Sequence, residues 1–185
     1  MKRIFATLAT INGLTIVLSA ALGWWSARGG RGLSEDRLYL AHFGSGLAAS
    51  IVTLLVHCIV FTYFLGTGRW VKEVKYAYHL DDEPWPRLTR ELKRRTFPFA
   101  LVAMLVTIAA AASGAGQQLQ EWPRQVHESL AVAVIGINLL VFALEYRNIS
   151  INGHAIETVT ALVEEIRASH HLPPSDLALQ QDAAQ

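Results

Sequence analysis

The sequence predicts an all-α membrane protein whose four transmembrane helices pack as an up-and-down bundle. Hydrophobic residues make up 52% of the 185 residues, and the charged residues lie mostly between long apolar runs. A soluble helical protein instead carries charge along each helix, on the face that meets water. The apolar runs occupy Ile4–Leu22, Phe43–Leu65, Phe97–Ala112 and Val126–Leu144. About 20 apolar residues of helix cross the hydrocarbon core of a bilayer, so each run predicts one span.

With their flanking residues, the spans are expected at 4–23, 43–65, 97–116 and 126–146, so residues 1–147 form one transmembrane domain. The connections after the first and third runs are short and rich in glycine, which makes successive helices antiparallel neighbours. Lys2 and Arg3 precede the first run as they would in a signal peptide. The run is longer than the apolar part of such a peptide, however, so it predicts a retained helix. No internal repeat of convincing length is visible.

The second connection is longer, and it mixes apolar with basic residues at 69–79 and 86–95. This composition predicts two short interfacial helices in a cytoplasmic loop. After the fourth run, apolar residues recur with a helical period, so 148–169 predicts a cytoplasmic amphipathic helix. Residues 170–185, with two prolines and an end rich in glutamine and alanine, predict a flexible tail.

The basic residues predict the orientation of the chain. Twelve of the sixteen lysines and arginines lie in the N-terminal segment, the second connection and the C-terminal segment. The positive-inside rule therefore places both termini in the cytoplasm of a bacterial-type inner membrane. Topology accounts for these charges, so the expected partner is the lipid bilayer and no nucleic acid is predicted.

Two histidines open apolar runs that point in the same direction. His42 precedes the second run and His127 the fourth, so in an up-and-down bundle the two imidazoles are expected at one depth, facing each other. Gly46 and Ala49 follow His42 on the same helical face, and small residues there admit either a neighbouring helix or a flat macrocycle. Two imidazoles from facing helices are what a bis-histidine b-type haem requires, with His42 and His127 as ligands of the iron.

This arrangement resembles the four-helix membrane cytochromes b, including the anchor subunits of quinone-linked respiratory complexes. The resemblance lies in architecture and histidine placement, and no signature motif is matched. It implies one-electron transfer between a quinone pool and a partner near the outer face. Two-haem members of such families carry a second histidine on each ligating helix. Here His57 has no such counterpart, because Phe142 stands at the matching position, so at most one haem b is expected.

His57, Asn138 and Glu145 are polar residues within or beside the spans, and such side chains usually point into the bundle. A His57–Glu145 pair with Asn138 nearby is a candidate proton relay. The alternative is that Glu145 only marks the inner boundary of the fourth span. Cys58, the single cysteine, excludes an intrachain disulfide and is expected to be a buried structural thiol.

Two other functions remain open from the residues alone. The basic loop and the amphipathic helix also fit a cofactor-free accessory subunit of a larger membrane complex. A small transporter would use Asn138, His57 and Glu145 as a polar path, although few polar residues line the runs. We find no nucleophile triad, zinc-protease motif or carboxylate pair, so the sequence leaves open whether the protein is an enzyme.

Overall fold

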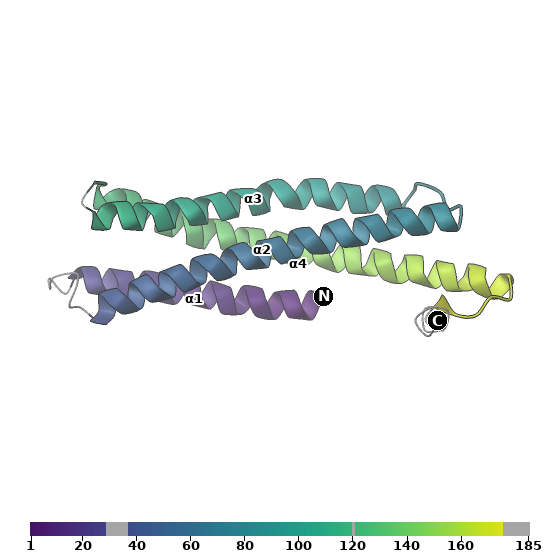
Figure 1. Cartoon of the computed structure of the whole chain (residues 1–185), viewed down its shortest axis with the longest axis horizontal. Coiled ribbons are helices and arrows are strands. Elements are labelled where there is room, and N and C mark those ends of the chain that lie inside the picture. Colours follow the sequence, from purple (N-terminus) through teal and green to yellow (C-terminus); the bar gives the residue numbers. More distant parts are fainter. Residues whose placement is uncertain (29–36, 120, 176–185) are drawn as a thin grey trace, which may run out of the picture.

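The computed structural model describes residues 1–28, 37–119 and 121–175, and within these residues the chain forms four helices and no strand (Figure 1). The helices are α1 (Lys2–Arg28), α2 (Arg37–Ala77), α3 (Trp85–Gln118) and α4 (Arg124–Ser169). Each is long and apolar enough to cross a membrane. The predicted all-α class with four candidate spans is therefore confirmed.

The four helices pack in the order of the chain. α1 lies mainly against α2, α3 lies mainly against α4, and the two pairs meet through α2–α3 and α1–α4 contacts. Successive helices run in opposite directions, so α2 and α4 run in the same direction across the bundle (Figure 1). This is the connectivity that short loops between helices favour.

Three helices continue well beyond the spans. α1 begins near the middle of the long axis, whereas α2, α3 and α4 extend past this point as a stalk (residues 66–77, 85–95 and 148–169; Figure 1). The stalk has its own buried apolar side chains, among them Val71, Leu92 and Val159. These continuous contacts favour unbroken helices. The structure therefore does not confirm separate interfacial helices or a separate amphipathic helix, because these segments are the ends of α2, α3 and α4.

Ion pairs and hydrogen bonds stabilise the α2–α3 turn and the residues after α4 at the end of the stalk. Asp82, in the turn between α2 and α3, accepts hydrogen bonds from Lys75 Nζ at 3.0 Å and from Arg90 Nη1 at 3.2 Å. The residues after α4 fold back, and Arg167 Nε donates to the carbonyl of Pro173 at 2.8 Å. The rest of the predicted tail, residues 176–185, lies outside the described residues.

Paired asparagine and threonine side chains connect the helices inside the bundle. In each pair the asparagine Nδ2 donates to the threonine Oγ1, and that hydroxyl donates to the carbonyl four residues earlier in its own helix. We call these pairs the Asn–Thr clasps. They are Asn12–Thr53 at 2.8 Å, Asn138–Thr107 at 3.2 Å, Asn148–Thr96 at 2.9 Å and Asn152–Thr67 at 3.0 Å.

The pairs α1–α2 and α3–α4 share one pattern of buried positions. A shift of 85 residues, which is the separation of Thr67 and Asn152, places every buried position of α2 from 49 to 64 on a buried position of α4. The matched residues are Ala49 and Val134, Thr53 and Asn138, Val56 and Val141, His57 and Phe142, Val60 and Glu145, and Phe64 and Ile149. A constant shift likewise relates Phe5, Asn12, Ile16 and Ser19 of α1 to Thr96, Ala103, Thr107 and Ala110 of α3.

The bundle therefore has an approximate two-fold axis along its length. Matched residues of α2 and α4 meet across this axis at three levels. The outer level holds His42 and His127, the middle level holds His57 and Phe142, and the inner level holds Thr67 and Asn152. Most matched side chains differ in type, which is why the sequence shows no repeat.

Candidate functional site

The structure brings His42 and His127 together. Their ring centroids lie 6.1 Å apart, with an angle of 67° between the ring planes. Both side chains are partly buried. The pair comes from the matched ends of α2 and α4, so the approximate symmetry of the bundle places the two imidazoles at one depth.

Each imidazole of this outer pair is held by a neighbouring helix. His42 Nδ1 donates to the carbonyl oxygen of Ser19 on α1 at 2.8 Å, and His127 Nδ1 donates to that of Ala110 on α3 at 3.1 Å. Ser113 Oγ, 3.1 Å from His127 Nδ1, is a second acceptor. A carbonyl oxygen only accepts, so Nδ1 carries the hydrogen in both neutral rings. Nε2 of each ring then keeps its lone pair, and no described residue forms a hydrogen bond with it.

A glycine lies against each ring of the outer pair. A Cβ atom on Gly23 would lie 2.7 Å from His42 Cε1, and one on Gly114 would lie 3.0 Å from His127 Cε1. These glycines occupy matched positions of α1 and α3. Each ring therefore packs directly on the backbone of a neighbouring helix, and neither α1 nor α3 projects a side chain from these positions.

Gly46 and Ala49 lie below the outer pair, where helices approach closely. A Cβ atom on Gly46 would lie 3.1 Å from Ser19 Oγ. Ala49 belongs to an apolar layer to which every helix contributes one residue, the others being Ile16, Ala110 and Val134. Of the two roles that the sequence left open for these small residues, helix packing is the one visible in the structure.

The structure also brings together His57, Asn138 and Glu145, the three residues of the candidate proton relay. All three are fully buried. His57 Nδ1 lies 2.8 Å from Glu145 Oε1, and His57 Nε2 lies 3.1 Å from Asn138 Oδ1. The imidazole stacks on Phe142, with centroids 5.3 Å apart and an angle of 28° between the planes.

The partners of Asn138 determine where one proton of His57 resides. Asn138 Nδ2 faces the carbonyl of Val134 at 2.9 Å and Thr107 Oγ1 at 3.2 Å. Thr107 donates its own hydrogen to the carbonyl of Ala103, so this hydroxyl accepts from Asn138. The amide oxygen of Asn138 must then face His57, and His57 Nε2 must carry a hydrogen.

The second nitrogen of His57 shares a proton with Glu145. This proton lies on Nδ1 in an ion pair or on Oε1 in a neutral pair. In either state both ring nitrogens are engaged, so His57 has no lone pair to offer a metal. The other oxygen, Glu145 Oε2, is buried and has no hydrogen-bond partner among the described residues.

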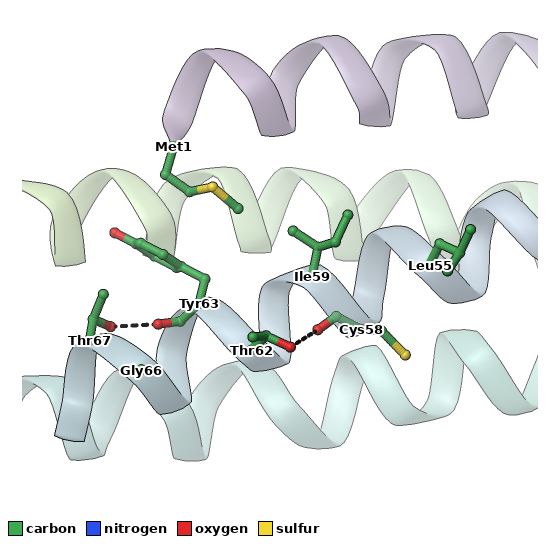
Figure 2. Close-up of a pocket in the computed structure, with 8 residues that line it drawn as sticks. All are labelled: Met1, Leu55, Cys58, Ile59, Thr62, Tyr63, Gly66 and Thr67. Carbon is green, nitrogen blue, oxygen red and sulfur yellow. Dashed lines mark hydrogen bonds between the residues drawn. The ribbon is translucent and has the colours of Figure 1, made fainter. Parts of the chain in front are cut away.

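An apolar groove lies outside the bundle core, beside Met1, which precedes α1. It measures about 540 Å³, and Figure 2 shows the lining residues Met1, Leu55, Cys58, Ile59, Thr62, Tyr63, Gly66 and Thr67. Cys58 is exposed there, so the expectation of a buried thiol was wrong. The cysteine lies on an outward face of α2, beside the buried His57 of the same helix. Within residues 1–28, 37–119 and 121–175, no three His, Cys, Asp or Glu side chains are grouped to hold a metal ion.

Comparisons of the chain with protein-family models, with curated proteins and with solved structures found no match. The case for a function therefore rests on the geometry of the outer and middle levels.

Proposed function

We propose that this protein is a membrane-embedded one-electron carrier that holds a single b-type haem between His42 and His127. The observation that carries the proposal is that the two imidazoles have the same tautomer and the same pattern of hydrogen bonds. Each donates Nδ1–H to a carbonyl of a neighbouring helix and keeps Nε2 as a free ligand nitrogen. Histidines that bind metals usually donate their other N–H in this way, which fixes the tautomer and the ring orientation.

The spacing of the two imidazoles supports this part of the proposal. Metal–imidazole nitrogen bonds are about 2.0–2.1 Å long, so two ligating nitrogens on opposite sides of a metal lie about 4 Å apart. Ring centroids at 6.1 Å are compatible with that separation. Gly23 and Gly114 let each imidazole pack against the backbone of α1 or α3, which holds the two rings in place. When bound, the haem would supply reversible one-electron chemistry at its iron. The chain would fix the two ligands and surround them with apolar helices.

The proposal also includes a location in the membrane and partners that exchange electrons with the protein. The twelve basic residues of the N-terminal segment, the second connection and the C-terminal segment support a bacterial-type inner-membrane location with both termini and the stalk in the cytoplasm. The outer pair then lies near the opposite face. A quinone pool and other membrane subunits are the electron partners that we propose, because single electrons must enter and leave through neighbouring carriers.

The test is a reduced-minus-oxidised visible spectrum of the full chain, purified in mild detergent and supplied with haem. We expect the α-band of a low-spin b-type haem. His42→Ala and His127→Ala should each abolish it while leaving the protein folded. His154→Ala is the matched control, because its side chain is 79% exposed on α4, and it should retain the band. A flat spectrum from folded wild-type protein would contradict the proposal.

A cofactor-free accessory subunit is the second candidate, and one observation favours it. The two imidazoles of the outer level already contact each other edge to face, so this level can pack without a bound group. The stalk would then present charged residues, such as Arg69 and Glu73 at its surface, to a partner subunit. This candidate predicts no visible band and co-purification with larger membrane subunits.

A further inference from the structure

The apolar groove beside Met1 has the depth of one membrane leaflet. Its lining residues on α2 run from Leu55 to Thr67, which is about 18 Å along the helix axis. Leu55 lies near the middle of the apolar run Phe43–Leu65, and Thr67 lies just past the end of that run. The hydrocarbon core of a bilayer is about 30 Å thick. The groove therefore extends from about the middle of the bilayer to its boundary on the stalk side.

The wall of the groove is suited to a hydrocarbon occupant (Figure 2). Thr62 Oγ1 donates to the carbonyl of Cys58 at 2.9 Å, and Thr67 Oγ1 donates to the carbonyl of Tyr63 at 2.8 Å. The hydrogens of both hydroxyls are thus used within α2. Gly66 adds no side chain to the wall, and a Cβ atom there would meet no neighbouring atom of the described chain within 4 Å.

The size of the groove distinguishes between apolar occupants. Its volume is about 540 Å³. A helix about 10 Å across would fill about 1,400 Å³ over the same length, so a helix from a partner or from a second copy does not fit inside. A single acyl chain is narrower, and the chains of one leaflet span half of the hydrocarbon core. An acyl chain therefore matches both the volume and the length of the groove.

Basic residues lie at the stalk-side end of the groove. Arg69 follows Gly66 by three positions, so the two residues share one face of α2. The Arg69 side chain is 82% exposed, and its Nε donates to Glu73. The guanidinium has four further N–H donors. Lys2 and Arg3 add two positive charges in the first turn of α1. This end of the groove favours an anionic headgroup, because basic side chains beside a membrane attract anionic lipids.

We propose that the groove binds one phospholipid with an anionic headgroup, from the leaflet on the stalk side. Its acyl chain lies along α2 against Ile59 and Gly66, and its phosphate accepts hydrogen bonds from Arg69. Met1 forms the opposite wall of the groove, so this acyl chain contacts both sides of the junction between α1 and α2. The site does not depend on a bound haem.

Photo-crosslinking of the full chain in phosphatidylcholine nanodiscs tests this site. The probe is phosphatidylglycerol with a diazirine at the end of one acyl chain, and phosphatidylcholine with the same labelled chain is the reference. We expect mass spectrometry to find phosphatidylglycerol adducts at Leu55, Cys58 or Ile59, about fivefold above the reference, since one basic residue near the surface contributes about that factor. Leu140, which matches Leu55 across the two-fold axis and is 74% exposed, should be labelled equally by both lipids.

Filling the groove tests the position of the acyl chain. Gly66→Leu places a side chain in the open space, and we expect it to reduce the groove adducts to the level at Leu140. Gly136→Leu is the matched control on α4, because an added Cβ there also meets no neighbouring atom of the described chain within 4 Å. It should keep the wild-type adducts at the groove.

Removing one charge tests the position of the headgroup. Arg69→Gln should lower the phosphatidylglycerol adducts about fivefold, to the level of the phosphatidylcholine reference. Arg124→Gln is the matched control, because Arg124 forms the same kind of pair with Glu128 at the opposite end of the bundle. It should keep the preference for phosphatidylglycerol. Arg69→Gln decides the test if Gly66→Leu does not fold.

Three results in folded wild-type protein would overturn the proposal. One is equal labelling of the groove by the two lipids. Another is the same preference for phosphatidylglycerol at Leu140 as at Leu55, which would show a general attraction of anionic lipid to the protein. The third is the absence of groove adducts together with a dimeric mass in detergent, which would assign the groove to a second copy of the chain.

Discussion

Gly23 and Gly114 show how a single missing atom shapes the outer level. Each glycine lets an imidazole rest on the backbone of the adjacent helix, and both imidazoles are thereby held in reach of each other. The contact is closer at Gly23, where a Cβ would lie 2.7 Å from His42 Cε1. Separations below 3.0 Å are not tolerated without movement of one partner, so position 23 is the stricter of the two.

We expect Gly23→Ala to destabilise the protein, because the new methyl group must displace the His42 ring. Overpacking of this kind typically costs about 1–3 kcal/mol. Thermal unfolding in detergent micelles measures the change. Gly44→Ala is the control on α2, where no atom lies within 4 Å of the added Cβ. It should be neutral or stabilising by about 0.5–1 kcal/mol, since alanine favours helix. Equal stability of the two variants would contradict the close packing at His42.

The middle level gives a second prediction at the residue scale. His57→Phe leaves the Glu145 carboxyl buried without its partner, and we expect a loss of about 3 kcal/mol in the free energy of unfolding. Glu145→Val leaves His57 Nδ1 unpaired, with a loss of about 1–3 kcal/mol. The double variant should be closer to wild type than the sum of the two losses, because it installs the residues that the other half carries at matched positions, Phe142 and Val60.

A thermodynamic cycle from chemical unfolding in detergent measures this coupling. The control pairs His57→Phe with Ser150→Ala, since the Ser150 hydroxyl only bonds the carbonyl of Tyr146 in its own helix. That combination should be additive. Additive losses in the His57–Glu145 cycle would show that the two side chains do not stabilise each other.

At the scale of the helices, the Asn–Thr clasps stabilise helix–helix contacts by hydrogen bonding. Spans in lipid need such contacts, because the hydrophobic effect does not drive apolar helices together inside a bilayer. Thr53, for example, accepts from Asn12 on α1 and donates to the carbonyl of Ala49 on α2. We expect Asn12→Leu and Thr53→Val to show a coupling energy of about 1 kcal/mol, the usual size for interhelical hydrogen bonds in membranes. Steric trapping or SDS-induced unfolding measures it. Asn12→Leu with Thr62→Val, where Thr62 lies on the exposed face of α2, should show no coupling.

The turn between α2 and α3 depends on a charged contact that responds to acid. Hydrogen bonds from Arg90 and Lys75 hold the pKa of the Asp82 carboxyl well below its usual range. The contact therefore stabilises the turn above the pKa of the unfolded carboxyl, about 3.9. That stabilisation is lost as the pH falls through the lower pKa of the folded state.

NMR titration of ¹³C-labelled aspartate carboxyls in micelles tests this assignment. Arg90→Ala should raise the pKa of Asp82 toward about 3.9, because it removes the largest stabilising hydrogen bond. Arg87→Ala is the control on the same helix, since Arg87 pairs with Glu83 instead, and it should leave the Asp82 titration unchanged. An unaltered Asp82 pKa in Arg90→Ala would show that this pair does not form in solution.

At the scale of the whole molecule, hydropathy and histidine spacing predict the four spans and the meeting of His42 with His127. The four spans follow from hydropathy. The meeting of the histidines follows from the antiparallel order of successive helices, because that order makes the second and fourth runs parallel. The stalk was not predicted, because the change from apolar to charged residues near Gly66 and Arg147 marks where lipid ends and not where a helix ends. The approximate symmetry also escapes the sequence. Thr53 and Asn138 share burial and depth without sharing a side chain. Among the polar or glycine positions discussed above, His42 matches His127 and Gly23 matches Gly114.

The orientation of the bundle in the membrane decides on which side electrons would enter the outer level. Positive charge at the stalk end, including Arg69, Arg87 and Arg90, opposes transfer of that end across an energised inner membrane. We therefore expect the stalk to be cytoplasmic. In a Cys58→Ser background, a membrane-impermeant maleimide added to intact bacterial cells should label Glu121→Cys, in the α3–α4 turn, and not Glu73→Cys, in the stalk. Both residues are exposed, so lysis should make both reactive. Labelling of Glu73→Cys alone in intact cells would reverse the topology and place the histidine pair at the cytoplasmic face.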